Sequence, residues 1–234
     1  RRLDAGDLIL MPQGSAHRMA SDPELVPPGE DERYFRKPDL QLPYLVREGA
    51  AEGPETRVVC GFLACDARPF NPLLAGLPPV LVLRSEGGED PLSQLMRYAV
   101  RESVEKRAGS DSVLARLSEL MFVEAVRRYV ETMPPDRAGW LAALRDPLVG
   151  RALACLHREV ARSWTLESLA AAAGASRTVL VERFTALAGE PPMHYLARWR
   201  MQLAARRLAD SDAKVATVAA EVGYESAAAF SRAF

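Results

Sequence analysis

The stretch Ala170-Ala171-Ala172-Ala173-Gly174-Ala175-Ser176, followed by Leu180 and Phe184, decides the fold of the C-terminal part of this chain. Its pattern returns as Ala219-Ala220-Glu221-Val222-Gly223-Tyr224-Glu225-Ser226, followed by Phe230 and Phe234, with one extra residue in the turn. In each copy, the small Ala allows two helices to cross closely and the Gly permits the left-handed backbone of a helix end. The Ser caps the next helix, and two apolar residues four apart turn one face inward. Each copy therefore predicts a helix-turn-helix, whose second helix enters a DNA major groove.

A third helix is predicted between the two copies, from Pro191 to Leu208. Its apolar and basic residues alternate near helical spacing: Leu196, Trp199, Leu203 and Leu208, with Arg198, Arg200, Arg206 and Arg207 between them. A helix of about fifteen residues spans roughly 22 Å, and successive turns of one groove lie roughly 34 Å apart. A single Ala-rich helix pair also occurs in helical bundles that bind nothing. Two such pairs on either side of a connecting helix favour a DNA-binding domain.

Several short motifs make this part of the chain resemble a known family. They lie at residues 165–170, 174–177, 189–193, 198–201, 223–226 and 230–234. Together they closely resemble the DNA-binding domain of AraC/XylS-type transcription regulators, over about residues 148–234. Members of that family usually continue with a basic stretch and a short capping helix. We therefore expect a chain that stops at Phe234 to be truncated there.

The N-terminal part has the composition of strands. Residues 8–11, Leu-Ile-Leu-Met, predict a short strand within the spacing Gly6-x5-Pro12-x-Gly14-x2-His17. This spacing resembles the second cupin motif, whose turn directs a His into a small β-barrel, although Ser21 replaces the usual closing Asn. Residues 58–64 predict a further strand, and residues 22–57 a long loop. With residues 71–79, these features resemble the cupin-like sensor domain of one branch of AraC-type regulators, with the first half of the barrel missing.

Residues 91–131 predict a helical hairpin. One face of its first helix is apolar at helical spacing: Leu92, Leu95, Met96, Ala99 and Val100. Gly109 breaks the helix and Asp111 is expected to cap its successor. The second helix is apolar on more than one side. Packing within its own domain would explain one side, and the resemblance favours a dimer interface on the other.

The residues between the hairpin and the C-terminal domain, 132–147, predict a connector with Pro134-Pro135. Asp146 is expected to cap the next helix and Pro147 to start it. Leu148, Ala152, Leu156 and Val160 form its predicted buried face. Cys155 lies on the same stripe and is interpreted as core packing.

Charge and composition agree with two domains and a reduced compartment. The net charge of −1 divides unequally, because residues 151–234 hold 11 Lys/Arg against 8 Asp/Glu. That excess is modest for a DNA binder. No apolar run reaches the roughly twenty residues of a membrane span, and no signal peptide is visible. Three cysteines fit reduced thiols in the cytoplasm better than a disulfide framework.

An enzymatic role is not expected. Cupin enzymes hold a metal through several His and a carboxylate, but two of the three histidines, His157 and His194, fall in the C-terminal helices. Cys60-x4-Cys65 lacks the second ligand pair of a zinc site. We therefore expect no metal, no cofactor and no catalytic residue.

Three residues remain candidates for sensing an effector or an oxidant. His17 either lines an effector pocket or is a hydrogen-bonded structural residue. Cys60 is either a redox-responsive thiol or, more commonly, a buried inert one. On one strand, Cys60 and Cys65 would lie roughly 17 Å apart at about 3.3 Å per residue, too far for a direct disulfide.

The expected DNA contacts follow from the inward direction of Leu180, Phe184, Phe230 and Phe234. The predicted reading face of the first recognition helix contains Arg177, Thr178, Val181 and Glu182, and that of the second contains Ser226, Ala227, Ala228, Ser231 and Arg232. Many members of the resembling family carry a basic or amide residue where Glu182 stands. A glutamate can accept a bond from cytosine N4, but it repels phosphates.

These observations predict an α+β protein in two domains. Residues 1–131 would form a partial cupin-like β-barrel with a helical dimerisation hairpin, residues 132–147 a linker, and residues 148–234 an all-α double helix-turn-helix domain. The expected function is a cytoplasmic, homodimeric transcription regulator that binds promoter or operator DNA and senses a small molecule or oxidant. The alternatives are a cupin-type metalloenzyme fused to helices, and a helical domain that binds a protein and not DNA.

Overall fold

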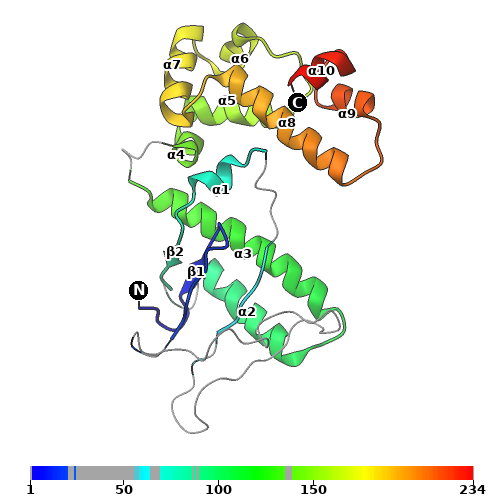
Figure 1. Cartoon of the computed structure of the whole chain (residues 1–234). Helices are drawn as coiled ribbons and strands as arrows, with labels where there is room; N and C mark the ends of the chain where they lie inside the picture. Colours follow the sequence, from blue (N-terminus) through cyan, green and yellow to red (C-terminus); the bar gives the residue numbers. More distant parts are fainter. Residues whose placement is uncertain are drawn as a thin grey trace. The chain divides into compact units, whose positions relative to one another are not determined.

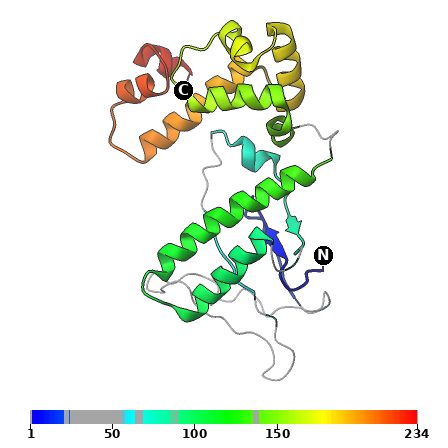
Figure 2. The ribbon, with the colours of Figure 1, turned by 180° about the vertical axis from the view of Figure 1, so that it is seen from behind.

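The computed structural model describes residues 2–20, 24, 56, 58–63, 69–85, 87, 90–134 and 139–233 (Figures 1 and 2). Ser21, Cys65, Phe234 and nearly all of the predicted loop over 22–57 lie outside these residues. The chain divides into two compact units. One contains Arg1–Leu63 with Pro79–Arg128, and the other contains Ala64–Pro78 with Tyr129–Phe234.

The first unit contains two short strands, β1 (Leu8–Leu10) and β2 (Leu81–Leu83). They pair antiparallel, with Ile9 opposite Val82. The strand predicted over 8–11 is thus confirmed, one residue shorter. The strand predicted over 58–64 is wrong, because residues 58–63 have no regular structure. The side chain of Phe62 in that stretch is 92 % exposed, so no buried face stabilises an extended ladder there.

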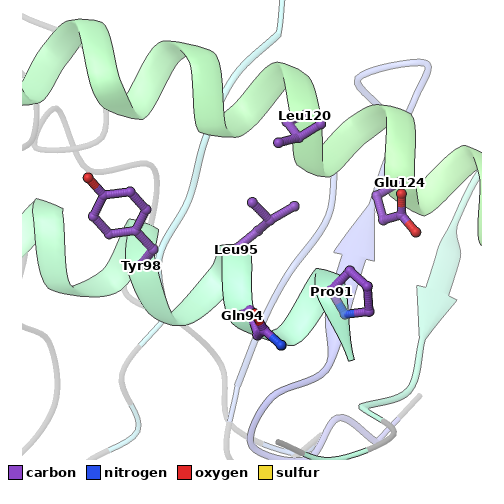
Figure 3. Close-up of a pocket in the computed structure, with 6 residues that line it drawn as sticks. All are labelled: Pro91, Gln94, Leu95, Tyr98, Leu120 and Glu124. Atoms are coloured by element: carbon purple, nitrogen blue, oxygen red, sulfur yellow. The ribbon is translucent and has the colours of Figure 1, made fainter. Parts of the chain in front are cut away.

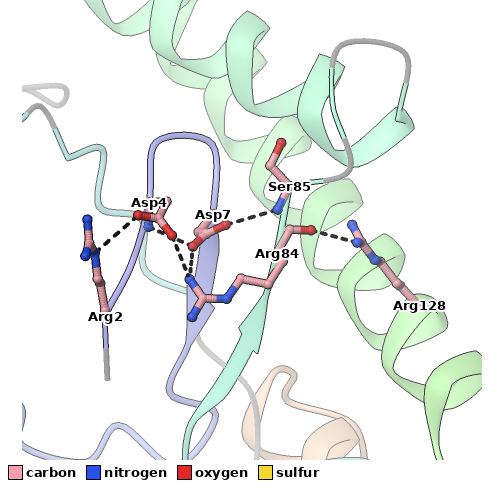
Figure 4. Close-up of polar contacts among 6 residues, drawn as sticks. All are labelled: Arg2, Asp4, Asp7, Arg84, Ser85 and Arg128. Atoms are coloured by element: carbon pink, nitrogen blue, oxygen red, sulfur yellow. Dashed lines mark hydrogen bonds and ion pairs between the residues drawn. The ribbon is translucent and has the colours of Figure 1, made fainter.

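A polar cluster fixes the ends of the two strands (Figure 4). The Asp7 carboxylate, just before β1, accepts hydrogen bonds from the Asp4 N–H at 2.8 Å and the Ser85 N–H at 3.0 Å, and it pairs with Arg84. The hydrogen bond from Asp4, together with those from Ser85 and Arg84, lowers the pKa of Asp7 against the opposing effect of burial. Arg128 donates to the Arg84 carbonyl at 2.6 Å. The cluster therefore ties both strands to the helix that carries Arg128.

That helix belongs to the predicted hairpin, which the structure confirms as α2 (Pro91–Glu105) and α3 (Ser110–Thr132), although Lys106 in a left-handed conformation ends α2, and not Gly109 as expected. The Glu102 carboxylate is buried at the turn, where it accepts from the Ser110 hydroxyl at 2.8 Å and pairs with Arg107. Arg107 holds the pKa of Glu102 below its ordinary value. The expectation for Asp111 is wrong. Because α3 already begins at Ser110, Asp111 lies in its first turn, where its charge favours the helix dipole but caps nothing.

The second unit is helical. It contains α4 (Trp140–Arg145), α5 (Pro147–Arg158), α6 (Leu166–Ala173) and α7 (Arg177–Ala188) around one apolar core. Helix α4 lies within the stretch predicted as a connector. Asp146 caps α5 as predicted, accepting from the Leu148 and Val149 N–H groups at 2.9 Å, and it also accepts from Arg183 of α7. Leu148, Ala152 and Leu156 are buried and Cys155 packs against the core, as expected, whereas Val160 lies beyond the end of α5 and is half-buried.

Helix α8 (Pro192–Ala209) belongs to two cores at once. Tyr195 and Leu196 in its first half lie in the core of α5, α6 and α7. Ala204 in its second half lies in a smaller core with residues of α9 (Val215–Glu221) and α10 (Ala227–Ala233). The predicted rod between the two helix-turn-helix copies is therefore confirmed.

Tyr195 is the polar centre of the larger core. Its hydroxyl accepts from Trp140 Nε1 at 2.9 Å and lies 2.7 Å from His157 Nε2. The His157 ring stacks on Trp199 with centroids 4.4 Å apart. Burial lowers the pKa of His157 and so favours its neutral form, in which an unprotonated Nε2 accepts a hydrogen bond from the Tyr195 hydroxyl.

We expect the second unit to lose stability as pH falls below about 6.5, the ordinary pKa of histidine. Since the folded-state pKa of His157 is lowered, its contribution is present above that value and is lost as pH falls towards the folded pKa. Urea denaturation followed by tryptophan fluorescence measures this unit alone, because Trp140, Trp164 and Trp199 all lie in it.

His157→Phe is the matched variant, since it retains stacking on Trp199 but cannot titrate. Its free energy of unfolding should change less than that of the wild type between about pH 7.5 and pH 5.5. The same pH dependence in both proteins would contradict the assignment of this effect to His157.

Candidate nucleic-acid interface

Local hydrogen bonds build the first helix-turn-helix, α6 and α7. Thr165 caps α6 in a capping box with Ser168. Gly174 ends α6 at φ +74°, a left-handed conformation that a side chain would strain. The Ser176 hydroxyl then accepts from the Val179 N–H at 3.3 Å and starts α7. The predicted turn is confirmed residue by residue.

The second copy, α9 and α10, repeats this construction. Gly223 has φ +87°, and the Ser226 hydroxyl accepts from the Ala229 N–H at 3.1 Å. A Cβ on Gly223 would lie 2.6 Å from the Ala161 carbonyl oxygen, so the second turn sits directly against the segment after α5. Arg200 of α8 donates to the Val160 and Arg162 carbonyls of that segment, at 3.0 and 2.8 Å. Close backbone contact therefore fixes the second helix-turn-helix against the segment that precedes α6.

On α7, the residues predicted to contact DNA differ in how exposed their side chains are. Leu180 and Phe184 are fully buried, and Thr178 and Glu182, which are four residues apart, are exposed away from them. Val181 is half-buried. Arg177 is exposed but pairs with Glu167 at 2.5 Å. Thr178 and Glu182 therefore form the centre of the outward face, and Arg177 lies at its edge.

On α10, Phe230 is buried and Ala228 and Arg232 form the exposed side, again four residues apart. Ser231 is exposed beside them. Ala227 is half-buried, and the Ser226 hydroxyl is engaged as a cap. Among the described residues, no hydrogen bond or ion pair engages the Arg232 side chain. Arg232 is therefore the cation that α10 presents.

Besides Arg183, which pairs with Asp146, two exposed α7 residues were missed by the sequence prediction. Val179 is 47 % exposed and Ala186 is exposed, both on the side away from Leu180. Apolar residues were expected to point inward, but their place along the helix relative to Leu180 and Phe184 would have indicated the outward face.

The four arginines of α8 are engaged within the unit. Arg198 pairs with Glu190 at 3.1 Å, Arg206 with Asp210 at 3.4 Å and Arg207 with Glu221 at 3.2 Å, while Arg200 bonds the carbonyls described above. The pairs of Arg206 and Arg207 are exposed on both sides and contribute only about 0–1 kcal/mol each, so phosphates can compete for these two arginines, whereas the Glu190 partner of Arg198 is largely buried. Arg200, bound to backbone carbonyls, has a structural role.

Of the three sensing candidates, the structure describes His17 and Cys60, whereas Cys65 lies outside the described residues. His17 is exposed, and its Nδ1 lies 3.1 Å from the Ser15 carbonyl oxygen. Cys60 is exposed, not buried. In the part of the chain that the structure describes, no three His, Cys, Asp or Glu side chains lie close enough to hold a metal ion.

The hairpin carries an apolar groove of about 440 Å³ (Figure 3). It lies between α2 and α3 and is lined by Pro91, Gln94, Leu95, Tyr98, Leu120 and Glu124. Leu120 and Val123 of α3 are 50 % and 51 % exposed.

Within the described residues, no helix is long and apolar enough to cross a membrane.

Comparisons with known proteins agree with this architecture. A cupin family model matches residues 1–131, and a helix-turn-helix domain model matches residues 169–234. No solved structure matches the chain significantly.

Similar proteins match almost the whole chain. An AraC-like transcription regulator of Streptomyces lividans is 35 % identical over 99 % of this chain and 75 % of its own length. The regulator AlkR of Acinetobacter baylyi is 28 % identical over 98 % and 76 %, respectively. The RCS-specific transcriptional activator RclR of Escherichia coli is 26 % identical over 99 % and 72 %. These relatives are transcription regulators and not enzymes, and the chain itself belongs to the AraC-type family of DNA-binding transcription regulators, with an N-terminal cupin domain and a C-terminal helix-turn-helix domain.

Proposed function

We propose that this regulator reads promoter or operator DNA through the outward faces of α7 and α10. The observation that carries the proposal is the repeated placement of exposed residues opposite a buried apolar pair: Thr178 and Glu182 on α7, Ala228 and Arg232 on α10. Arg177, Val181, Ser231, Ser226 and Ala227 flank these positions. The small Ala228 permits close approach and methyl contact with thymine, and Arg232 has the reach for a guanine edge or a phosphate.

We assign the remaining roles by domain. Residues 1–131 form a partial cupin-like barrel with the dimerising hairpin and sense a small molecule or oxidant, with His17, Cys60 and Cys65 as candidate contacts. Residues 132–147 connect this domain to the DNA-binding domain over 148–234, and they include α4, which packs in the core of the DNA-binding unit. The chain acts in the cytoplasm as a homodimer, without a cofactor. The E. coli relative is named as an RCS-specific activator, which supports a specific signal for this chain as well.

Arg232→Ala should weaken specific DNA binding by about 1–3 kcal/mol. If Arg232 reads a guanine, discrimination should relax at one base position. If it holds a phosphate, all sequences should weaken together and the salt slope should fall by about one. Fluorescence anisotropy with a duplex selected by the wild type from a random library measures both quantities.

Arg158→Ala is the matched control, because it removes the same charge from an exposed position on α5, outside both recognition helices. Its effect should be small. Equal losses in the two variants would assign the effect to net charge, and unchanged affinity and salt slope in Arg232→Ala would remove Arg232 from the interface.

Footprinting should show two contacted major-groove segments per subunit, about one helical turn apart.

Leu120→Glu with Val123→Glu should shift the homodimer towards monomer. Both side chains are about half exposed on α3, and burying two carboxylates in an apolar interface is costly. Sedimentation velocity over a range of protein concentrations measures the shift. Val215→Glu, at a comparably exposed valine of α9, should leave association unchanged. Association of the double variant equal to that of the wild type would rule out this face as the dimer interface.

Mild hypochlorite should convert the Cys60 thiolate to a sulfenic acid, with release of chloride, before it oxidises methionine. The expectation rests on the exposure of Cys60 and on the reactivity of accessible thiolates. Mass spectrometry after trapping with dimedone detects the product, and the exposed Met19 serves as the internal reference. Oxidised Met19 alongside unmodified Cys60 would exclude Cys60 as the sensing thiol.

A further inference from the structure

A short segment from the part of the sequence matched by the cupin model packs within the DNA-binding unit. Residues 70–77 include α1 (Pro72–Gly76) and belong to the same compact unit as α4 to α10. Phe70 and Leu77, at the two ends of the segment, are buried. Phe70 is a member of the core that contains Leu180, Phe184 and Tyr195. The segment is thus a structural part of the unit that carries the recognition helices.

Phe70 binds one stripe of α8. Its N–H donates to Gln202 Oε1 at 2.7 Å, its ring meets Tyr195 edge-on at 5.5 Å, and Arg198 Cζ lies 4.0 Å from its ring centroid. These three α8 residues are at positions i, i+3 and i+7, which share one helix face. The Gln202 side chain is buried and has no other hydrogen-bond partner among the residues described. Without the segment, the Gln202 side chain would lose its hydrogen-bond donor and the Tyr195 ring would lose its contact with Phe70.

The rest of the segment fits tightly against α4. The Asn71 side chain caps α1 by accepting from the Leu74 N–H at 3.0 Å. A Cβ on Gly76 would lie 3.0 Å from Leu141 Cγ, and Leu141 is almost fully buried. A side chain at position 76 therefore needs Leu141 to shift.

The segment continues directly into the strand pair of the other unit. Only residues 78–80 separate the buried Leu77 from Leu81, the first residue of β2. A chain extends by at most about 3.6 Å per residue, so these three residues form a short covalent connection between Leu77 and Leu81. The Asp7 cluster holds β2 to β1 at its far end. A rearrangement of this strand pair therefore acts on the docked segment through the covalent chain.

We propose that residues 70–77 are the coupling segment of this regulator, which transmits changes in the strand pair of the cupin domain to α8. The contacts of Phe70 hold α8 in place, and α8 is the helix that positions both helix-turn-helix copies. A shift of β2 weakens the Phe70–Gln202 contact, loosens α8 and lowers the affinity for DNA. The inference rests on the proposed DNA contacts of α7 and α10.

A double-mutant cycle on the full chain tests the coupling. Asp7→Asn weakens the cluster at β1 and β2 without touching the DNA-binding unit, and Phe70→Ala removes the docked ring. The affinity for a duplex selected by the wild type from a random library is measured for all four proteins. Asp7→Asn should lower affinity at least about threefold in the wild-type background and by less than about twofold with Phe70→Ala. Equal effects in the two backgrounds, including no effect in either, would overturn the proposal.

Tryptophan fluorescence checks the fold of the DNA-binding unit in each variant, since all three tryptophans lie there. If Phe70→Ala unfolds this unit, Gln202→Leu replaces it in the cycle, because it removes the acceptor at similar volume. Gln202→Glu retains an acceptor for the Phe70 N–H and should restore the response to Asp7→Asn; no restoration would overturn the role of this hydrogen bond. Failure of the wild type to select any DNA sequence would instead contradict the proposed function.

Discussion

The buried hydroxyl of Tyr195 is the constraint on which the DNA-binding unit depends. A phenol in an apolar core must find hydrogen-bond partners, and here Trp140 of α4 and His157 of α5 supply them. Because Tyr195 belongs to α8, this small network joins three helices at one point. Phe184 and Phe70 complete the surroundings with edge-on ring contacts. The position of α8 relative to α4 and α5 is therefore set by directional bonds as well as by apolar packing.

The orientation of the two recognition helices follows from α8. The first half of α8 packs into the core behind α7 and the second half into the core behind α10, so neither recognition helix can move without its half of the rod. Arg200 and the close approach of Gly223 to Ala161 add a direct connection between the second helix-turn-helix and the segment after α5. This double attachment explains why the second turn requires glycine for its position as well as for its backbone angle.

Acidic side chains and backbone carbonyls already bind several arginines of the DNA-binding unit. Most arginines near the predicted groove face are held by acidic side chains or carbonyls, and Arg232 stands out on α10 as the exposed cation without a partner among the described residues. Weak surface pairs release their arginines to phosphates at little cost, so a small net charge is compatible with DNA binding. Sequence discrimination would then depend on few residues, with Glu182 restricting which bases α7 accepts.

The sequence alone determined the features that depend on neighbouring residues. The caps at Asp146, Ser176 and Ser226, the glycine turns and the apolar faces of α7, α10 and the hairpin each arise within about four residues, so their spacing predicts them. The strand expected over 58–64 is absent from the described residues 58–63 because a strand depends on pairing with a distant partner. The same reason hides Phe70, whose partner Gln202 lies 132 residues away. Contacts between neighbouring residues determine where helices start and stop. Only the packed structure decides which distant surfaces meet, because burial of one side chain requires a partner that sequence spacing does not specify.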